Sequence, residues 1–182
     1  MFHKSDKNKN EVTVVAVHVD DCTIAASNLH LIEESKASLR KHVEVTDLGE
    51  LHWMLGIKIK QNRDEGTIHL SQRAYINSIL RCYNFDELKP LFTPMDPSIC
   101  LSSDQSPSTT AEHAIMRDKP YREAVGALNW AALATRPDTA FAVATVARFA
   151  ANPGPAHWEV VKQIYCYLAG TRDLWLTYGE TK

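Results

Sequence analysis

Apolar, β-branched runs near the start of the chain flank one adjacent pair of acidic residues. The stretch is Val12–Ser27, and the acidic pair within it is Asp20 and Asp21. The runs on both sides have the length and composition of β-strands. Neighbouring carboxylates cannot pass through a continuous buried strand, because unpaired buried charge is very costly. The pattern therefore predicts two antiparallel strands joined by a tight turn that carries both aspartates.

An amphipathic helix and a second hairpin follow this stretch. The helix is predicted over Asn28–Val45, with Asn28 as its N-cap. Its apolar positions fall on one face, and they are Leu29, Ile32, Leu39 and Val43. The run Leu51–Lys60 ends in strand alternation and is predicted to pair with Thr67–Leu70. Gly56 interrupts the strand pattern, which indicates a bulge or a close approach by another backbone.

The rest of the chain is predicted to be mainly helical. Ser71 is the expected N-cap of a helix over Gln72–Tyr83, and Ser102–Thr110 has the composition of a linker. A helix over Pro120–Ala134 is expected to bury Tyr121, Val125, Leu128 and Leu133. Thr135–Asp138 resembles a capping box, and it opens a helix with apolar residues Phe141, Val143, Val146 and Phe149. A last helix begins at Pro155 and ends near Gly170, and Leu174–Tyr178 is a final strand with no partner in view.

Composition sets the broad class of the protein. The chain has 182 residues, 45% of them hydrophobic and 23% charged, which is typical of a globular protein. No apolar run is long enough to span a bilayer, and the polar segment Met1–Asn10 holds no signal sequence. We therefore expect an intracellular protein with no membrane contact. The net charge of −2 argues against a stand-alone nucleic-acid binder, and the four scattered cysteines are expected to be reduced.

The acidic pair is the candidate chemical centre. Carboxylate oxygens are the ligands that Mg²⁺ prefers, and a turn can bring two of them together on one cation. Asp is also a common turn residue, because its side chain bonds nearby backbone N–H groups. The pair alone leaves both interpretations open.

The order of motifs along the chain resembles reverse transcriptases of copia-type long-terminal-repeat retrotransposons. The resemblance runs from about Val12 to Tyr178. It is carried by short motifs in a fixed order, namely His18–Asp21, Asp47–Leu51, Leu55–Ile57, Ile68–Gln72, Thr93–Pro94, Tyr121–Arg122 with Val125–Gly126, Thr135–Asp138, His157–Trp158 and Tyr167–Thr171.

The resemblance implies a role for the first of these motifs. His18–Asp21 is similar to the palm turn whose carboxylates bind two Mg²⁺ ions during transfer of a nucleotide to a primer. Asp20 and Asp21 would be the catalytic metal ligands, with His18 as their neighbour. The implied partners of the parent enzyme are an RNA or DNA template–primer and deoxynucleoside triphosphates. Its implied location is a cytoplasmic virus-like particle or the nucleus.

The same resemblance implies a domain plan within the α+β class. Residues 1–62 would be a partial palm with the start of a primer-grip hairpin, and residues 63–100 a thumb-like segment. Residues 101–119 would be a linker, and residues 120–182 a helical connection leading toward an absent ribonuclease H. Nucleic acid would contact the primer-grip-like and thumb-like positions, which are Met54, Leu55, Gly56 and Arg73.

The sequence departs from the family pattern at three points that bear on the implied polymerase activity. His18 replaces the usual tyrosine, and Thr46 replaces a lysine that is frequent before the Asp-Leu-Gly motif. No residue of the chain substitutes for the third catalytic aspartate, since Asp6 lies in a polar segment. We therefore expect a C-terminal fragment of the polymerase that is inactive alone.

Two alternatives remain beside the polymerase fragment. The chain could be a non-catalytic retroelement remnant that binds nucleic acid, in which case binding should fall steeply with salt. It could also be a phospho-receiver domain, which begins with an apolar strand ending in Asp-Asp but requires five alternating strand–helix units. In either polymerase-derived case, open sheet edges would favour self-association.

Overall fold

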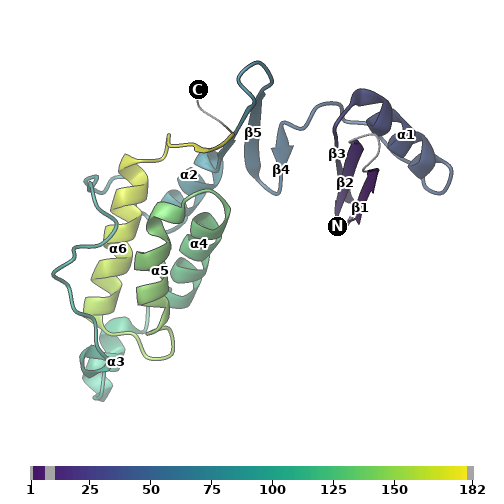
Figure 1. The fold of residues 1–182 in the computed structure, drawn as a ribbon. Coiled ribbons are helices and arrows are strands. Elements are labelled where there is room, and N and C mark those ends of the chain that lie inside the picture. The colour runs from purple at the N-terminus through teal and green to yellow at the C-terminus, as the bar shows by residue number, and fades with distance from the viewer. Residues whose placement is uncertain (1, 7–10, 180–182) are drawn as a thin grey trace. The chain divides into compact units, whose positions relative to one another are not determined.

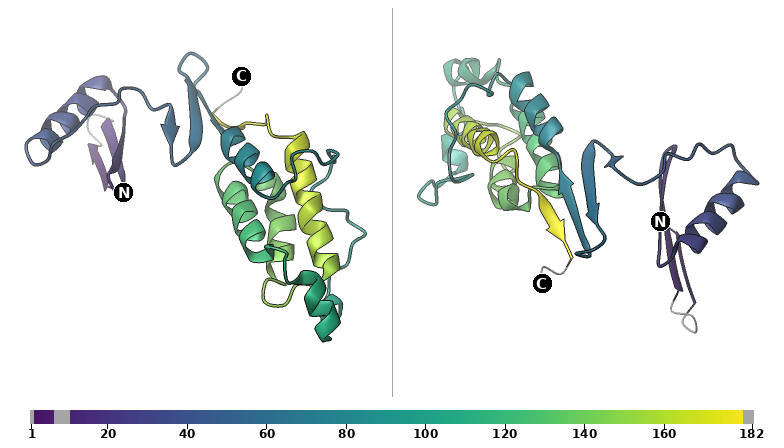
Figure 2. Two further views of the ribbon diagram at one scale, coloured as in Figure 1. Left: turned by 180° about the vertical axis from the view of Figure 1, so that it is seen from behind. Right: turned by 90° about the horizontal axis from the view of Figure 1, so that it is seen from above.

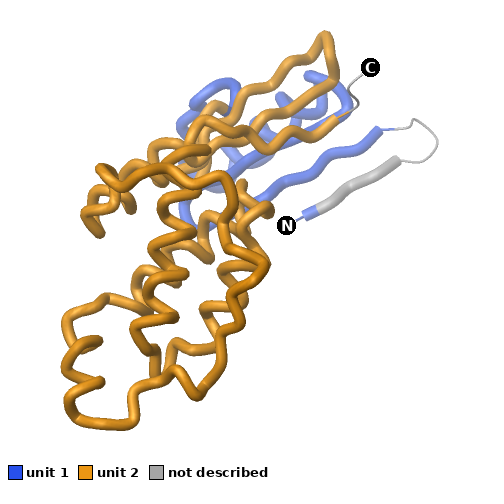
Figure 3. The backbone as a smooth tube through the Cα atoms, turned by 90° about the vertical axis from the view of Figure 1, so that its left-hand side faces the viewer, with its two compact units in different colours: residues 1–51 blue, residues 52–182 orange. Residues whose placement is uncertain are grey.

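The computed structural model describes residues 2–6 and 11–179 and divides the chain into two compact units. Unit 1 comprises residues 1–51 and unit 2 comprises residues 52–182 (Figure 3). Both units combine an antiparallel sheet with helices, so the predicted α+β class is confirmed. The helices α1–α6 and the strands β1–β5 are labelled in Figure 1.

Unit 1 is a three-stranded antiparallel sheet with one helix. The strands, in sheet order, are β1 (Phe2–Asp6), β2 (Glu11–His18) and β3 (Asp21–Ala26). The helix α1 (Leu29–Arg40) follows and lies against β3. Asn28 is its N-cap as predicted, because the Asn28 side chain accepts a hydrogen bond of 3.0 Å from the backbone N–H of Leu31.

The first strand corrects one expectation. The segment Met1–Asn10 was expected to be a polar tail, but residues 2–6 form β1 and pair with β2, with Phe2 opposite Val15 and Asp6 opposite Glu11. Residue 1 and residues 7–10 lie outside the described residues. The composition of the segment does not indicate a strand, because Phe2 is the only large apolar residue among residues 2–6.

The helix α1 ends earlier than predicted and does not cover a core. It stops at Arg40 rather than Val45, and Leu29 and Val43 are exposed. Among the described residues of unit 1, no apolar side chain is fully buried. Apolar burial is the main favourable term in folding, so this unit gains little stability from its own interior.

Unit 2 begins with a four-stranded antiparallel sheet. Its strands, in sheet order, are β4 (Trp53–Met54), β5 (Ile57–Asn62), β6 (Thr67–Ser71) and β7 (Leu176–Tyr178). The last strand was expected to lack a partner. It pairs with β6 instead, with Leu70 opposite Leu176, and Figure 2 shows it returning beside the β5–β6 hairpin. The pairing joins segments about a hundred residues apart, which no local pattern can indicate.

Four longer helices pack beside one another and enclose the hydrophobic core of the protein (Figure 1). They are α2 (Arg73–Cys82), α4 (Tyr121–Ala134), α5 (Ala140–Ala147) and α6 (Pro155–Gly170). The short helices η1 (Ser103–Gln105), α3 (Thr110–Met116) and η2 (Pro137–Thr139) lie in the connections. Fully buried side chains from the four long helices include Leu80, Leu128, Val146, Ile164, Tyr165 and Leu168.

The helix faces were mostly predicted correctly, with two exceptions. Leu133 was expected in the core, but 76% of its surface is exposed. Phe141, one of the apolar residues predicted for the next helix, is 78% exposed. In α4 the small residues Ala131 and Ala132 are buried beside the exposed Leu133, so residue size alone did not indicate the inward side of this helix. The N-cap of α2 is Gln72 rather than Ser71, although the Ser71 hydroxyl still accepts a bond of 3.3 Å from the backbone N–H of Arg73.

Strand direction excludes one of the alternative folds. All strand pairs of the described residues are antiparallel, whereas a phospho-receiver domain requires alternating strand–helix units and a parallel sheet. The receiver hypothesis is therefore wrong. Within the described ranges, no helix combines the length and the apolar character needed to cross a membrane.

Candidate functional site

The two aspartates lie at the turn that the sequence predicts. The strand β2 ends at His18 and β3 begins at Asp21, and these two residues are opposite each other across the ladder. Val19 and Asp20 form the two-residue turn between them. The φ angle of Val19 is 54°, in the left-handed region that a β-branched residue very rarely adopts. Such a conformation costs on the order of 1–3 kcal/mol and is found most often at functional sites.

This turn presents its polar side chains to solvent. His18, Asp20 and Asp21 are all exposed, and 83% of the Val19 surface is accessible. Neither carboxylate forms an ion pair with another described residue. The structure therefore brings the three predicted residues together on one exposed bend, with both carboxylates open to a cation.

The donor set at this turn is incomplete for a two-metal centre. No group of three or more His, Cys, Asp or Glu side chains that could hold a metal ion occurs among the described residues. The backbone of Asp6 lies opposite Glu11, at the far end of β2 from the turn. Mg²⁺ requires six oxygen ligands and two ions require several shared carboxylates. Asp20 and Asp21 alone do not fit such a centre.

The predicted primer-grip residues form a second tight turn, in unit 2. Met54 ends β4, and Leu55 and Gly56 connect it to β5 with φ angles of 53° and 76°. Gly56 was expected to lie within a strand at a bulge or a close approach, and this prediction is wrong. A Cβ atom at Gly56 would meet no heavy atom within 4 Å, so the glycine serves the positive φ angle of the turn.

Arg73, the fourth predicted nucleic-acid position, lines a groove in unit 2 with a volume of about 350 Å³. The groove also contains Trp53, Lys58, Asp173 and Trp175, none of which was predicted as a binding residue from the sequence. Lys58 lies in the alternating run that was predicted as a strand, whereas Trp175 joins the groove only through the unpredicted pairing of β7 with β6. Since Asp20 and Asp21 belong to unit 1, the predicted residues fall into two separate sets.

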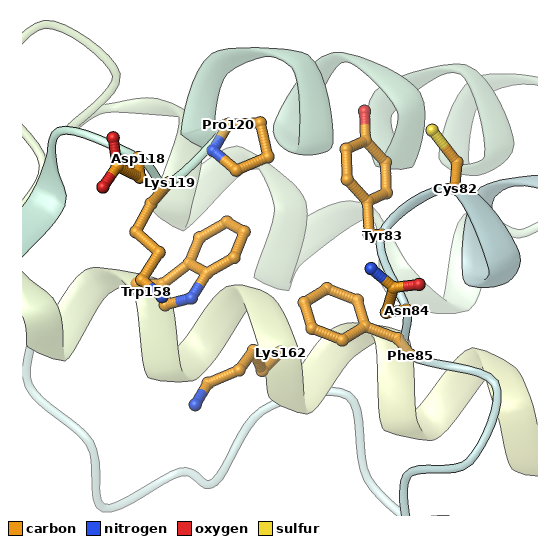
Figure 4. A pocket seen from close by; sticks show the side chains of 9 residues that line it. All are labelled: Cys82, Tyr83, Asn84, Phe85, Asp118, Lys119, Pro120, Trp158 and Lys162. Carbon is orange, nitrogen blue, oxygen red and sulfur yellow. The ribbon is translucent and has the colours of Figure 1, made fainter.

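A second hollow, of about 360 Å³, lies between the end of α2 and α6 (Figure 4). Tyr83 and Phe85 follow from α2, and Trp158 and Lys162 come from α6. Only 8% of Phe85 and 7% of Trp158 is exposed, so these rings belong to the core. Of the aromatic rings that line the hollow, Tyr83 alone is partly exposed.

Several motif residues in unit 2 hold the helices together. Thr135–Asp138 was predicted to cap a helix, but no side chain of this segment caps α5. Instead the buried Arg136 guanidinium donates to Asp138 and to Thr171, at the end of α6. The Tyr167 hydroxyl donates to the same Asp138 carboxylate at 2.7 Å. These side chains are therefore committed to internal contacts.

Comparison with known proteins agrees with the family resemblance found in the sequence. The family described as "Reverse transcriptase (RNA-dependent DNA polymerase)" matches residues 1–97, just over half of the chain. The chain is 39% identical over 172 residues to the retrovirus-related Pol polyprotein from transposon TNT 1-94 of Nicotiana tabacum. It is 36% identical over 172 residues to that from transposon RE1 of Arabidopsis thaliana and 32% identical over 165 residues to a transposon Ty5-1 protein of Saccharomyces cerevisiae.

These alignments cover most of this chain but much less of the relatives. They include 94%, 93% and 90% of this chain. In the same order, they span 13%, 11% and 51% of the relatives' lengths. No solved structure matches the chain.

Proposed function

We propose, from the premise that the chain belongs to the reverse transcriptase (RNA-dependent DNA polymerase) family of copia-type retrotransposons, that it supplies the C-terminal part of a polymerase core. The parent enzyme would extend a primer on an RNA or DNA template, using deoxynucleoside triphosphates and Mg²⁺. This chain would contribute two of the metal-binding carboxylates and part of the primer-binding surface. It would be inactive alone.

The observation that carries this proposal is the geometry of the Asp20–Asp21 turn. A strained backbone at Val19 places two adjacent carboxylates at an exposed bend with no competing ion pair among the described residues. Structural turns rarely retain such strain, because Gly or Asn at the same position would relieve it. Binding of a divalent cation by both carboxylates would be a functional reason to retain the strained backbone at Val19.

The remaining assignments follow the family plan. Residues 1–62 would form a partial palm that reaches into the primer-grip hairpin, and residues 63–100 a thumb-like segment. Residues 101–119 would link these to a connection-like region over 120–182. The Leu55–Gly56 turn suits contact with a primer backbone, because Gly56 has open space beside it and 40% of Leu55 is exposed.

A non-catalytic role is the second candidate function. It is favoured by the incomplete donor set, because the described residues provide no third carboxylate near the turn. In that case the chain would bind nucleic acid without extending it. The two candidates share the nucleic-acid surface and differ only in the use of Asp20 and Asp21.

Primer extension distinguishes them. The chain alone should extend no primer in the presence of Mg²⁺ and all four deoxynucleoside triphosphates. A fusion that places the preceding polymerase segment of the tobacco relative before residue 1 should restore extension. Asp20→Asn in this fusion should abolish it. Asp64→Asn, which alters an exposed aspartate at another hairpin turn, should leave it intact.

Two results would contradict the proposal. Extension by the unfused chain would show that the two carboxylates suffice, which opposes the fragment interpretation. A folded fusion that extends equally well with Asp20→Asn would show that the turn is not the metal site. A folded fusion with no extension in any form would favour the non-catalytic candidate.

A further inference from the structure

One face of the unit 2 sheet carries aromatic and basic side chains in a row across the strands. Trp53 on β4 is opposite Lys58 on β5, and Lys58 is opposite Ser71 on β6. Trp175 directly precedes β7, and its indole meets the edge of the His69 ring with 6.5 Å between ring centroids. Directly opposed residues project from the same face of a sheet, so Trp53, Lys58 and Ser71 share one surface, and Trp175 lines the same groove as these residues.

A groove of about 350 Å³ is formed where this face meets the first turns of α2. Arg73 and Asn77 come from α2, and Asp173 and Trp175 come from the segment after α6. The indoles are accessible, since 54% of Trp53 and 40% of Trp175 is exposed. A pocket of this size accommodates a small organic group such as one nucleobase with its sugar.

The charges in the groove favour an anionic ligand. Lys58 forms no ion pair with another described residue. Arg73 contacts Asp173 at 2.9 Å, but 61% and 68% of these side chains are exposed. Exposed ion pairs contribute little and exchange readily, so a phosphate can replace the Asp173 carboxylate. Two cations then face the ligand.

A polar group suited to base recognition completes the groove. The side-chain carbonyl oxygen of Asn77 accepts a hydrogen bond of 3.2 Å from the Arg172 guanidinium, which fixes the orientation of the side-chain amide. No described residue accepts a hydrogen bond from its amide nitrogen. Because Asn77 lines the groove, this nitrogen remains available to donate a hydrogen bond to a ligand.

We propose that this groove binds an unpaired segment of single-stranded nucleic acid, with bases stacked on Trp53 and Trp175 and phosphates at Lys58 and Arg73. Accessible indoles beside basic side chains are the usual means of binding single strands, because every base has a face that can stack. An acidic peptide would use the cations but would leave both indoles without a partner. The site deepens the proposed function, since it rests on nucleic acid as the partner, but it is independent of the Asp20–Asp21 turn.

Fluorescence anisotropy with the full chain tests this site. The probe is a labelled single-stranded oligonucleotide of about 12 nucleotides, within the span that such surfaces cover. Trp53→Ala and Trp175→Ala should each weaken binding by about fivefold or more, the range expected for loss of one stacked base. The matched control is Trp130→Ala on α4, where 38% of the tryptophan is exposed outside the groove. It should leave the affinity unchanged.

Two further measurements separate stacking from general electrostatics and from misfolding. Trp175→Phe should retain most of the affinity, because a phenyl ring still stacks. An abasic oligonucleotide of the same length should bind the parent chain more weakly than the intact probe binds Trp175→Ala, because it loses the stacking on both tryptophans. Asp173→Asn should tighten binding, since it removes the carboxylate that competes with phosphate for Arg73.

The proposal is overturned by any of three results. These are no binding of the probe at low ionic strength, equal losses in Trp130→Ala and Trp175→Ala, and equal affinity for intact and abasic probes. Each of them leaves the primer-extension outcome of the fusion unaffected. Failure of the groove and failure of the polymerase assignment are thus distinguishable.

Discussion

Removing the partner of Arg136 should destabilise unit 2 more than any exposed substitution. Only 2% of the Arg136 side chain is accessible, and its guanidinium makes a two-pronged contact with Asp138, at 3.0 and 2.7 Å. It also donates to the carbonyl oxygen of Thr171 at 3.1 Å and to the Thr171 hydroxyl at 2.6 Å. The arginine therefore joins the α4–α5 connection to the end of α6.

Asp138→Ala and Arg136→Met should both lower the free energy of unfolding, but by different amounts. Asp138→Ala leaves a guanidinium buried without its counter-charge, which typically costs about 3–5 kcal/mol. Arg136→Met leaves a carboxylate that is 35% exposed, can be hydrated and keeps its bond from Tyr167. Loss of the charge-assisted hydrogen bonds should then cost about 1.5–3 kcal/mol. The double substitution should cost less than the sum, because it leaves no buried charge.

Urea unfolding followed by far-ultraviolet circular dichroism measures these differences, since the helices of unit 2 dominate the signal. The matched control is Glu159→Ala, which removes an exposed ion pair with Lys162 and should cost about 0–1 kcal/mol. The reasoning fails if Asp138→Ala costs no more than Glu159→Ala, or if the single costs simply add in the double variant.

Three other expectations can be checked by similar means. Burial lowers the pKa of His157 below 6.5, outweighing its hydrogen bond to a backbone carbonyl, so stability should be constant above pH 6.5 and fall as the pH drops below it. This slope should be absent in His157→Leu when urea midpoints are measured across that range. Gly154→Ala should lower the unfolding midpoint strongly, because the added Cβ would overlap the backbone oxygen of Gln105, whereas Gly126→Ala has open space and should not. Deleting residues 1–51 should leave the thermal midpoint of the helical unit unchanged, because every buried apolar residue of the described chain lies in unit 2.

Helices with strong apolar periodicity were predicted well from the sequence. The predicted helix over Pro120–Ala134 is α4, and the one from Pro155 to Gly170 is α6. Each buries a stripe of large apolar residues against the others, so the local pattern and the packed structure agree. The error at Leu133 arises because the alanine-rich helix α4 buries Ala131 and Ala132 and exposes the larger leucine beside them.

Strand pairing was predicted only where the partners are adjacent in sequence. The β2–β3 turn was found because two apolar runs enclose two charges that cannot be buried. The strand β1 was missed altogether, whereas β7 was predicted as a strand but its pairing with the distant β6 was not. The same limit applies to the candidate sites: the Asp20–Asp21 turn is local, whereas the groove needs Trp53 and Trp175 brought together across the sheet.

The motifs that carry the family resemblance divide into two physical kinds. The motifs at the Asp20–Asp21 and Leu55–Gly56 turns contain exposed side chains or residues with positive φ angles. Their exposed side chains are free to contact a ligand. In the helical region they are buried or internally bonded, as for Arg136 and for His157, whose ring stacks on Phe149 with 4.1 Å between centroids. A basic motif residue in that region therefore cannot be assigned to nucleic acid from its charge alone, since every hydrogen bond of Arg136 is to its own fold.

If unit 2 binds nucleic acid as proposed, the contacts would come from side chains that the fold leaves available. Lys58 and the two groove tryptophans meet this condition, although none was selected as a binding residue from the sequence. Scaffold and binding surface thus depend on different residues of the same unit. Substitutions at Arg136 should reduce stability and binding together, whereas substitutions at Trp175 should reduce binding while the unfolding midpoint stays the same.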